Sequence, residues 1–178
     1  MKRYKVILTE SEMRKLNEVR RDVRAKRLVL NDDDIDTKDE DDFITVNHIN
    51  KSNYKKYIGR KVNVTGDVYL EKLGLKEIPI TFGTVGGDFY CYDNELTSLS
   101  GCPHKVGITF VCSYNNLTSL AGCPSEVGGS FYCCNDRLTS LSGCPHKVGG
   151  NFDCSNNKKQ FTINNIKRFC KVGGDIFN

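Results

Sequence analysis

A repeat of 21 residues is the feature that most restricts how this chain can fold. One unit runs from Val85 to Lys105, and further units start at Val106, Val127 and Val148. Each unit contains Val-Gly, then an aromatic residue and a cysteine, then Leu-Thr-Ser-Leu and Gly-Cys-Pro, with the fourth unit diverging after its cysteine. A unit this short cannot bury its apolar side alone, so the units must stack into one continuous core. The repeat therefore predicts a solenoid.

Composition divides the chain into two parts. Residues 1–63 contain 16 basic and 12 acidic residues but no cysteine, whereas residues 64–178 contain 10 of each charge, all 9 cysteines and most of the 16 glycines. Weaker copies of the repeat start at Val64 and Val172. We therefore predict an N-terminal strand–helix cap with an acidic loop over residues 1–63. Residues 64–178 are predicted to form a solenoid of about five units.

Each position of the repeat has a predicted structural role. Phe89 and Cys91 point into the core of a short strand and Tyr90 points outward, because strand side chains alternate. Asn94 is expected to bond turn amides of the next unit. Gly86 and Gly87 are expected to provide a turn with positive φ. The Gly-Cys-Pro element excludes a helix on the returning side.

These motifs resemble known repeat families. The order Phe89, Cys91, Asn94, Leu96 resembles the leucine-rich repeat, and Leu-Thr-Ser-Leu is similar to the short repeats of bacterial leucine-rich-repeat effectors. Gly-Cys-Pro and Val-Gly-Gly resemble uncharacterised repeat proteins of tailed bacteriophages. The resemblance implies an α/β fold: a short leucine-rich-repeat solenoid with parallel strands, a helix-free convex side and an N-terminal α/β cap. It also implies a phage protein that binds and inhibits or redirects a host protein, such as a defence protein.

The cysteines follow the same 21-residue period. Seven of the nine fall into two columns, and Cys134 and Cys170 fall outside them. Because a free cysteine behaves as a small buried hydrophobe, we interpret the columns as core packing in a reducing compartment. Zinc at the Cys-Pro-His elements (Cys102 with His104, Cys144 with His146) and a redox role for Cys134 are weaker alternatives. We expect no metal and no cofactor.

The outward strand positions are the candidate partner-binding surface. Tyrosine is favoured at recognition surfaces because its large ring ends in a polar group, although it also has a high β propensity on any solvated sheet. The predicted partner-binding residues are Tyr69, Glu71, Asp88, Tyr90, Tyr92, Val111, Tyr132 and Asp153.

The charged N-terminal part offers a second candidate surface. A capping box at Thr9–Glu12 starts a predicted helix that ends near Leu28, after a strand over residues 2–8. One face of this helix is basic and makes nucleic-acid binding the alternative to a solvated surface; its residues are Arg14, Arg20, Arg21, Arg24 and Arg27. Residues 31–42 contain 8 acids and form a predicted acidic loop. A further strand is predicted over residues 43–49.

The sequence favours a binding protein over an enzyme. It lacks the catalytic motifs GxSxG, HExxH and GxxxxGK[ST], and it has only three histidines. No segment approaches the ~20 apolar residues of a membrane span, and the first residues lack the apolar run of a signal peptide. We therefore expect a cytoplasmic, non-enzymatic protein–protein interaction module. The alternative functions are a virion-associated structural protein that self-associates at the solenoid ends, and the nucleic-acid binder; the oligomeric state stays open.

Overall fold

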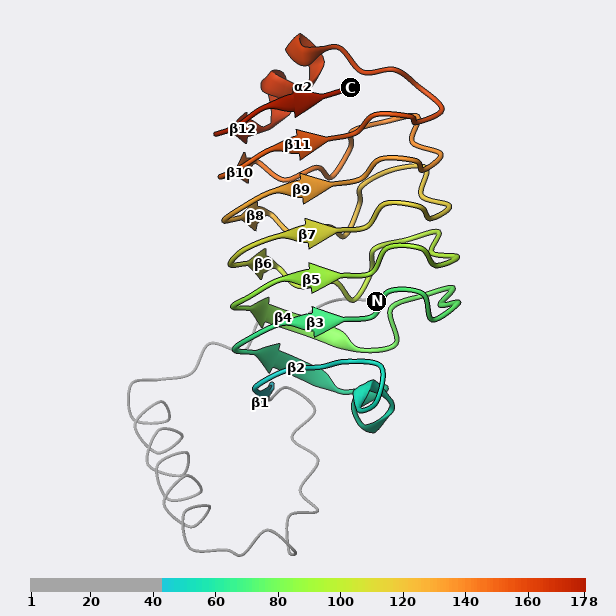
Figure 1. Ribbon diagram of the computed structural model, residues 1–178, viewed down its shortest axis with the longest axis vertical. Coiled ribbons are helices and arrows are strands. Elements are labelled where there is room, and N and C mark those ends of the chain that lie inside the picture. Colours follow the sequence, from blue (N-terminus) through green and yellow to red (C-terminus); the bar gives the residue numbers. More distant parts are fainter. Residues whose placement is uncertain (1–42) are drawn as a thin grey trace, which may run out of the picture. The chain divides into compact units, whose positions relative to one another are not determined.

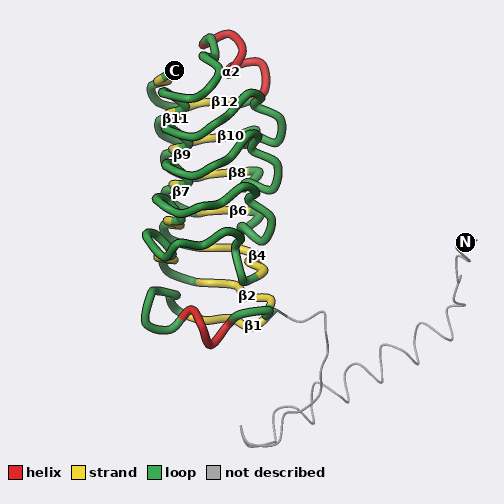
Figure 2. The backbone as a smooth tube through the Cα atoms, turned by 90° about the vertical axis from the view of Figure 1, so that its right-hand side faces the viewer, coloured by secondary structure: helices red, strands yellow, loops and turns green. Residues whose placement is uncertain are grey.

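The computed structural model describes residues 43–178, and all strand pairs in this range are parallel. Figures 1 and 2 show the strands stacked in one direction along the long axis of this unit. The described elements are β1 (Ile44–Val46), the 3-10 helix η1 (Tyr54–Tyr57), β2 (Lys61–Val64), β3 (Val68–Tyr69), β4 (Thr81–Val85), β5 (Phe89–Tyr90), β6 (Lys105–Val106), β7 (Phe110–Val111), β8 (Glu126–Val127), β9 (Phe131–Tyr132), β10 (Lys147–Val148), β11 (Phe152–Asp153), α2 (Ile163–Phe169), β12 (Lys171–Val172) and β13 (Ile176–Phe177).

Each coil of the chain contributes one strand to each of two sheets. One sheet of the described range has seven strands in the order β1-β2-β4-β6-β8-β10-β12, and the other has six in the order β13-β11-β9-β7-β5-β3. The register follows the repeat, so that Phe89 lies beside Phe110 and Phe110 beside Phe131. The predicted parallel-strand solenoid is therefore confirmed. The valine that starts each unit belongs to the seven-stranded sheet, which the sequence analysis did not anticipate.

The solenoid unit extends further toward the N-terminus than residue 64. Contacts divide the chain between residues 40 and 41, and β1 pairs with β2 in the first sheet. Ile49 is fully buried and makes an isolated parallel bridge to Val68, as a strand of the second sheet would. Residues 44–60 thus form an additional coil, in which η1 replaces the usual loop. The predicted strand 2–8, helix 10–28 and acidic loop 31–42 lie outside the described residues.

Stacked aromatic rings fill the centre of the solenoid. Phe89, Phe110, Phe131 and Phe152 are fully buried. The centroids of the Phe89 and Phe110 rings are 5.3 Å apart at 11°, and those of Phe110 and Phe131 are 5.5 Å apart at 7°. This spacing follows from the distance between neighbouring strands, which is about 4.8 Å. One phenylalanine from each of four successive coils therefore contributes to a continuous column, which Val68 and Ile176 extend at its two ends.

The asparagine of each coil ties it to its neighbour. The Asn115 Oδ1 accepts the Leu96 N–H at 2.9 Å, and its Nδ2 donates to the Cys91 and Cys112 carbonyls at 3.0 and 2.9 Å. Asn94 and Asn157 make equivalent bonds. The predicted bonds from the asparagine to backbone amides are present, but the amide belongs to the preceding coil and not to the next one.

The role predicted for the paired glycines was wrong. Positive φ occurs at Gly101, Gly122 and Gly143, not at Gly86 or Gly87. A Cβ on Gly86 or on its equivalents Gly107 and Gly128 would instead collide with a backbone carbonyl of the preceding coil. Glycine is needed there because neighbouring backbones approach too closely for any side chain.

The last coil accommodates the only α-helix of the described range. Val148 pairs with Val172, so this coil spans 24 residues instead of 21. Thr162 caps α2, and its Oγ1 accepts the Asn165 N–H. Ile166 anchors the helix in the core, where it is fully buried. The returning segments of the earlier repeat units contain no helix, as predicted. No helix within residues 43–178 combines the length and hydropathy needed to cross a bilayer.

The phenylalanine column should dominate stability. We expect Phe110→Ala to lower the free energy of unfolding by about 3–5 kcal/mol, because it leaves a cavity between two stacked rings. Ile108→Ala is the matched control, since Ile108 is 51% exposed, and should change it by less than about 0.5 kcal/mol. Urea unfolding followed by circular dichroism measures both. Similar losses for the two variants would contradict the assigned packing.

Asp136 replaces asparagine in the ladder and should make stability depend on pH. Its Oδ1 accepts the Asn115 N–H at 2.9 Å, whereas its buried Oδ2 has no hydrogen-bond partner. The repeat places Oδ2 where the asparagines donate to carbonyls, and a carboxylate has no hydrogen to donate. Burial raises the pKa of Asp136 to about 7, against the opposing effect of its backbone hydrogen bonds.

The sign of the pH effect follows from this raised pKa. The folded protein holds the Asp136 proton more tightly than the unfolded chain, so its contribution is fully present below about pH 4 and is lost as pH rises through about 7. We expect Asp136→Asn to stabilise the protein by about 2–4 kcal/mol at pH 8 and by much less at pH 4. Chemical unfolding at both pH values tests this. The control Asp175→Asn, at an exposed side chain, should change stability by less than about 0.5 kcal/mol at both pH values.

Candidate interaction face

The outward side chains of the six-stranded sheet form one continuous surface. In register, the column between the two core residues of each strand is Tyr69, Tyr90, Val111, Tyr132, Asp153 and Phe177. These side chains are half-buried or exposed, whereas Phe89 and Cys91 on either side of Tyr90 are fully buried. The structure thus brings together the predicted column. We call this column, with the neighbouring Glu71, Asp88 and Tyr92, the tyrosine face; in Figure 1 its strands β3 to β11 form the front column.

Three tyrosines form a contiguous aromatic group at the N-terminal end of this face. The rings of Tyr69 and Tyr90 stack with centroids 5.5 Å apart at 29°, and Tyr90 meets Tyr92 edge-on at 6.3 Å and 82°. Such pairs add about 0.5–1.5 kcal/mol beyond area burial. The rings are therefore held in place before any partner arrives. Tyr132 lies two coils away from Tyr90, with Val111 between them.

The aspartates beside these tyrosines carry charge and also bond the backbone of the next coil. The Asp67 Oδ1 accepts the Asp88 N–H at 2.8 Å, and the Asp88 Oδ1 accepts the Thr109 N–H at 2.8 Å. Ser130 and Asn151 continue the same ladder in later coils. The second oxygen of Asp67 accepts the Tyr69 hydroxyl at 3.2 Å. The sequence marked Asp88 only as a surface residue; the structure shows that one of its oxygens also holds the backbone of the next coil.

Electrostatics at this end of the face are negative. Burial and then the Asp67 carboxylate raise the pKa of Tyr69, with smaller effects from Asp88 and Glu71. Burial and then Asp88 raise the pKa of Tyr90. The carboxylates act in this direction because they disfavour a second negative charge on the phenol. Both tyrosines therefore stay neutral hydrogen-bond donors at physiological pH.

The second outward column is less uniform than the sequence suggested. It runs Glu71, Tyr92, Ser113, Cys134, Ser155. Ser113 is only 3% exposed and lies against Cys134, with its Oγ 3.2 Å from the Cys134 Sγ. Tyr92 is half-buried, and the Lys72 Nζ lies 5.7 Å from its ring centroid. Only the N-terminal part of this column can therefore contribute much to a binding surface.

The sequence analysis missed one member of the tyrosine face, and its second candidate surface falls outside the described residues. Phe177 is 47% exposed and follows Asp153 in register. A 21-residue period does not predict this pairing, because the last coil is 24 residues long. Aligning the two Val-Gly-Gly elements at residues 148 and 172 would have revealed it. The second candidate surface lies outside the described residues; its members are Arg14, Arg20, Arg21, Arg24 and Arg27.

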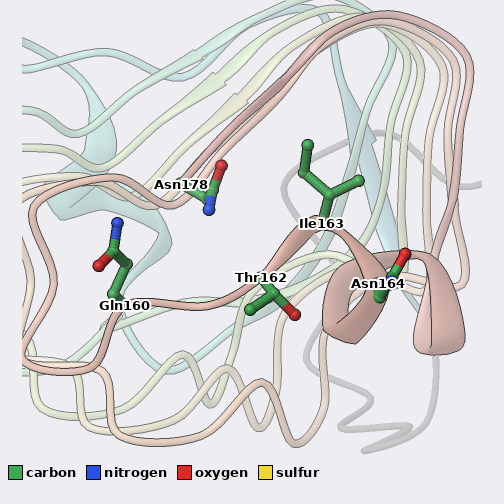
Figure 3. Close-up of a pocket in the computed structure, with 5 residues that line it drawn as sticks. All are labelled: Gln160, Thr162, Ile163, Asn164 and Asn178. Carbon is green, nitrogen blue, oxygen red and sulfur yellow. The ribbon is translucent and has the colours of Figure 1, made fainter.

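The C-terminal coil contains an open depression of about 450 Å³, but its chemistry is limited. Figure 3 shows its lining residues, which come from the segment before α2, the start of α2 and the C-terminus: Gln160, Thr162, Ile163, Asn164 and Asn178. None of these five side chains ionises near neutral pH. The Asn178 Nδ2 donates to the Phe161 carbonyl at 2.6 Å. The lining offers hydrogen bonds but no acid, base or strong nucleophile.

Comparisons with known proteins add no relative. Neither the scan against family models nor the searches of curated proteins and of solved structures found a match. The argument for function therefore rests on the geometry of the described residues.

The cysteines are free thiols, and their burial differs between the two columns. Cys91, Cys112, Cys133 and Cys154 are buried in the core. In the second column only Cys102 is buried, whereas Cys123 and Cys144 are half-buried. Cys170, expected outside both columns, is also buried, and this burial raises its pKa to about 12. Among residues 43–178, His, Cys, Asp and Glu do not gather in metal-binding groups of three or more.

Alkylation should separate these thiols. Burial raises the pKa of Cys112 and Cys133 well above its usual range and that of Cys154 to about 12. Since the thiolate is the reacting form, iodoacetamide should modify the half-exposed Cys134 at least about tenfold faster than Cys112 in the native protein. Peptide mass spectrometry over a time course measures the rates. Equal rates in native buffer would contradict the packed core, and unfolding in urea should equalise them.

Proposed function

We propose that this solenoid is a non-enzymatic protein-recognition module that binds its partner through the tyrosine face. The supporting observation is the in-register column of outward Tyr69, Tyr90 and Tyr132 on a rigid sheet. Tyrosine loses little conformational entropy on binding, and the rings of Tyr69 and Tyr90 are already held by stacking and by the bond from Tyr69 to Asp67. Preorganisation of this kind lowers the cost of association.

The repeat type and the biological setting form part of the same proposal. The asparagine ladder and the leucines at Leu96, Leu117 and Leu138, all fully buried, support a leucine-rich-repeat assignment. The resemblance of the Gly-Cys-Pro and Val-Gly-Gly elements to bacteriophage proteins supports a phage protein that acts in the host cytoplasm. Its partner is then a host protein, such as a defence protein, which it inhibits or redirects. The nine free thiols are consistent with a reducing compartment.

The proposal is tested by removing two rings from the face. We expect Tyr90→Ala with Tyr132→Ala to leave the fold intact, because both side chains are only half-buried, and to weaken partner binding by about tenfold or more. The measurement is an affinity pull-down from bacterial lysate read by mass spectrometry, in which wild type and variants are compared.

A second double variant serves as the matched control. Ile163→Ala with Phe169→Ala also removes two exposed apolar side chains, but from α2, away from the tyrosine face. A partner lost with the tyrosine variant and retained with the α2 variant supports the proposal. A partner that both variants capture as well as wild type does would refute it.

A further inference from the structure

Two chemically different groups of side chains meet at the N-terminal end of the tyrosine face. One is the aromatic group of Tyr69, Tyr90 and Tyr92. Its ring centroids are 5.5 Å apart between Tyr69 and Tyr90 and 6.3 Å apart between Tyr90 and Tyr92. The other is a group of three carboxylates on the same two coils. Its members are Asp67, Asp88 and Glu71, which we call the acidic group. Aromatic rings and carboxylates both attract cations, so the two groups favour the same kind of ligand.

The charge of the acidic group is uncompensated within the described part of the chain. The Oδ1 atoms of Asp67 and Asp88 accept backbone N–H groups, and the Asp67 Oδ2 accepts the Tyr69 hydroxyl. These donors are neutral, and none of the three carboxylates forms an ion pair with a lysine or arginine of residues 43–178. One oxygen of Glu71, Oε2, is covered yet has no hydrogen-bond partner. A covered acceptor without a donor is unfavourable, and no donor of the described residues offsets the charge of Glu71 at this oxygen.

The chain itself shows that this surface accepts a cation on an aromatic ring. The Lys72 Nζ lies 5.7 Å from the centroid of the Tyr92 ring, within the range of a cation–π contact. Within the described residues no such cation is placed over Tyr69 or Tyr90. The rings with the strongest carboxylate neighbours are therefore the ones left open. Burial, and after it the neighbouring carboxylates, raise the pKa of both tyrosines, and the contribution of the carboxylates reflects the negative charge at this end of the face.

We propose that the acidic end of the tyrosine face binds a basic segment of the partner protein, with an arginine stacked on Tyr69 and Tyr90 and its guanidinium among Asp67, Asp88 and Glu71. This proposal rests on the proposed function and specifies the partner. Arginine suits the surface better than lysine because its flat guanidinium stacks on aromatic rings and bonds two carboxylate oxygens at once. Acidic segments, nucleic acid and anionic lipid are repelled by the same charges.

Binding of defined peptides to the full chain tests the chemistry directly. The probe is a short fluorescent peptide in which arginine alternates with glycine, and the reference peptide has citrulline, an uncharged isostere, in place of each arginine. We expect fluorescence anisotropy to show binding of the arginine peptide and about tenfold or weaker binding of the citrulline peptide, with affinity falling as salt is raised. Equal binding of the two peptides, or none of the arginine peptide, would overturn the proposal.

Variants locate the site. Glu71→Gln with Asp88→Asn removes two charges but keeps the oxygen that accepts the Thr109 N–H, so folding is preserved. This variant should bind the arginine peptide about tenfold more weakly. The matched control, Glu77→Gln with Asp175→Asn, removes two charges from exposed side chains that are not part of the tyrosine face, and it should bind like wild type. Equal losses in both variants would show unspecific attraction and would sink the proposal.

The chain's own basic segment is the competing occupant. If Arg20→Gln with Arg21→Gln and Arg24→Gln tightens binding of the arginine peptide, the face is occupied by that segment, and the proposal of a partner's segment is wrong.

Failure of the basic-partner proposal can be distinguished from failure of the proposed function. A lysate partner that depends on Tyr90 and Tyr132 but not on Glu71 and Asp88 would leave protein recognition standing while refuting a basic partner.

Discussion

Stacking of identical coils in register is the constraint on which the structure depends. In the central coils each residue lies beside its equivalent 21 positions away, so a residue chosen in one coil is repeated as a column through the stack. A phenylalanine becomes a stack of rings, a cysteine a line of thiols and an asparagine a ladder of hydrogen bonds. The column of Gly86, Gly107 and Gly128 has the same origin, since adjacent backbones leave no room for a Cβ.

The in-register stacking also distinguishes columns that serve packing from columns that are free to serve binding. Inward columns are nearly uniform because every coil meets the same packing problem, whereas the outward column changes from tyrosine to valine, aspartate and phenylalanine along the sheet. Departures from uniformity mark places where packing is not the deciding factor. At the N-terminal end they combine stacked tyrosines with uncompensated carboxylates, and this combination supports a basic partner. Asp136 departs from uniformity in the core instead, and there the result is a pH-dependent cost.

Several structural features could be predicted from the sequence because they depend on period alone. The stack of parallel strands, the outward position of Tyr90 and the bonding role of Asn94 all follow from the repeat and from the alternation of strand side chains. Where the period changed, prediction failed. The insertion of α2 lengthened the last coil, so Phe177 was not recognised as a member of the outward column.

By itself, the sequence determined which residues share a column and therefore which of them form the core. Only the tertiary structure decided what each atom of a column does. It showed that one oxygen of Asp67 and of Asp88 holds the next coil, that Gly86 and its equivalents allow a close backbone contact, and that the valines belong to the seven-stranded sheet. The physical reason is that periodicity fixes neighbours along the stack, whereas competition for donors and space is settled between segments that only folding brings together.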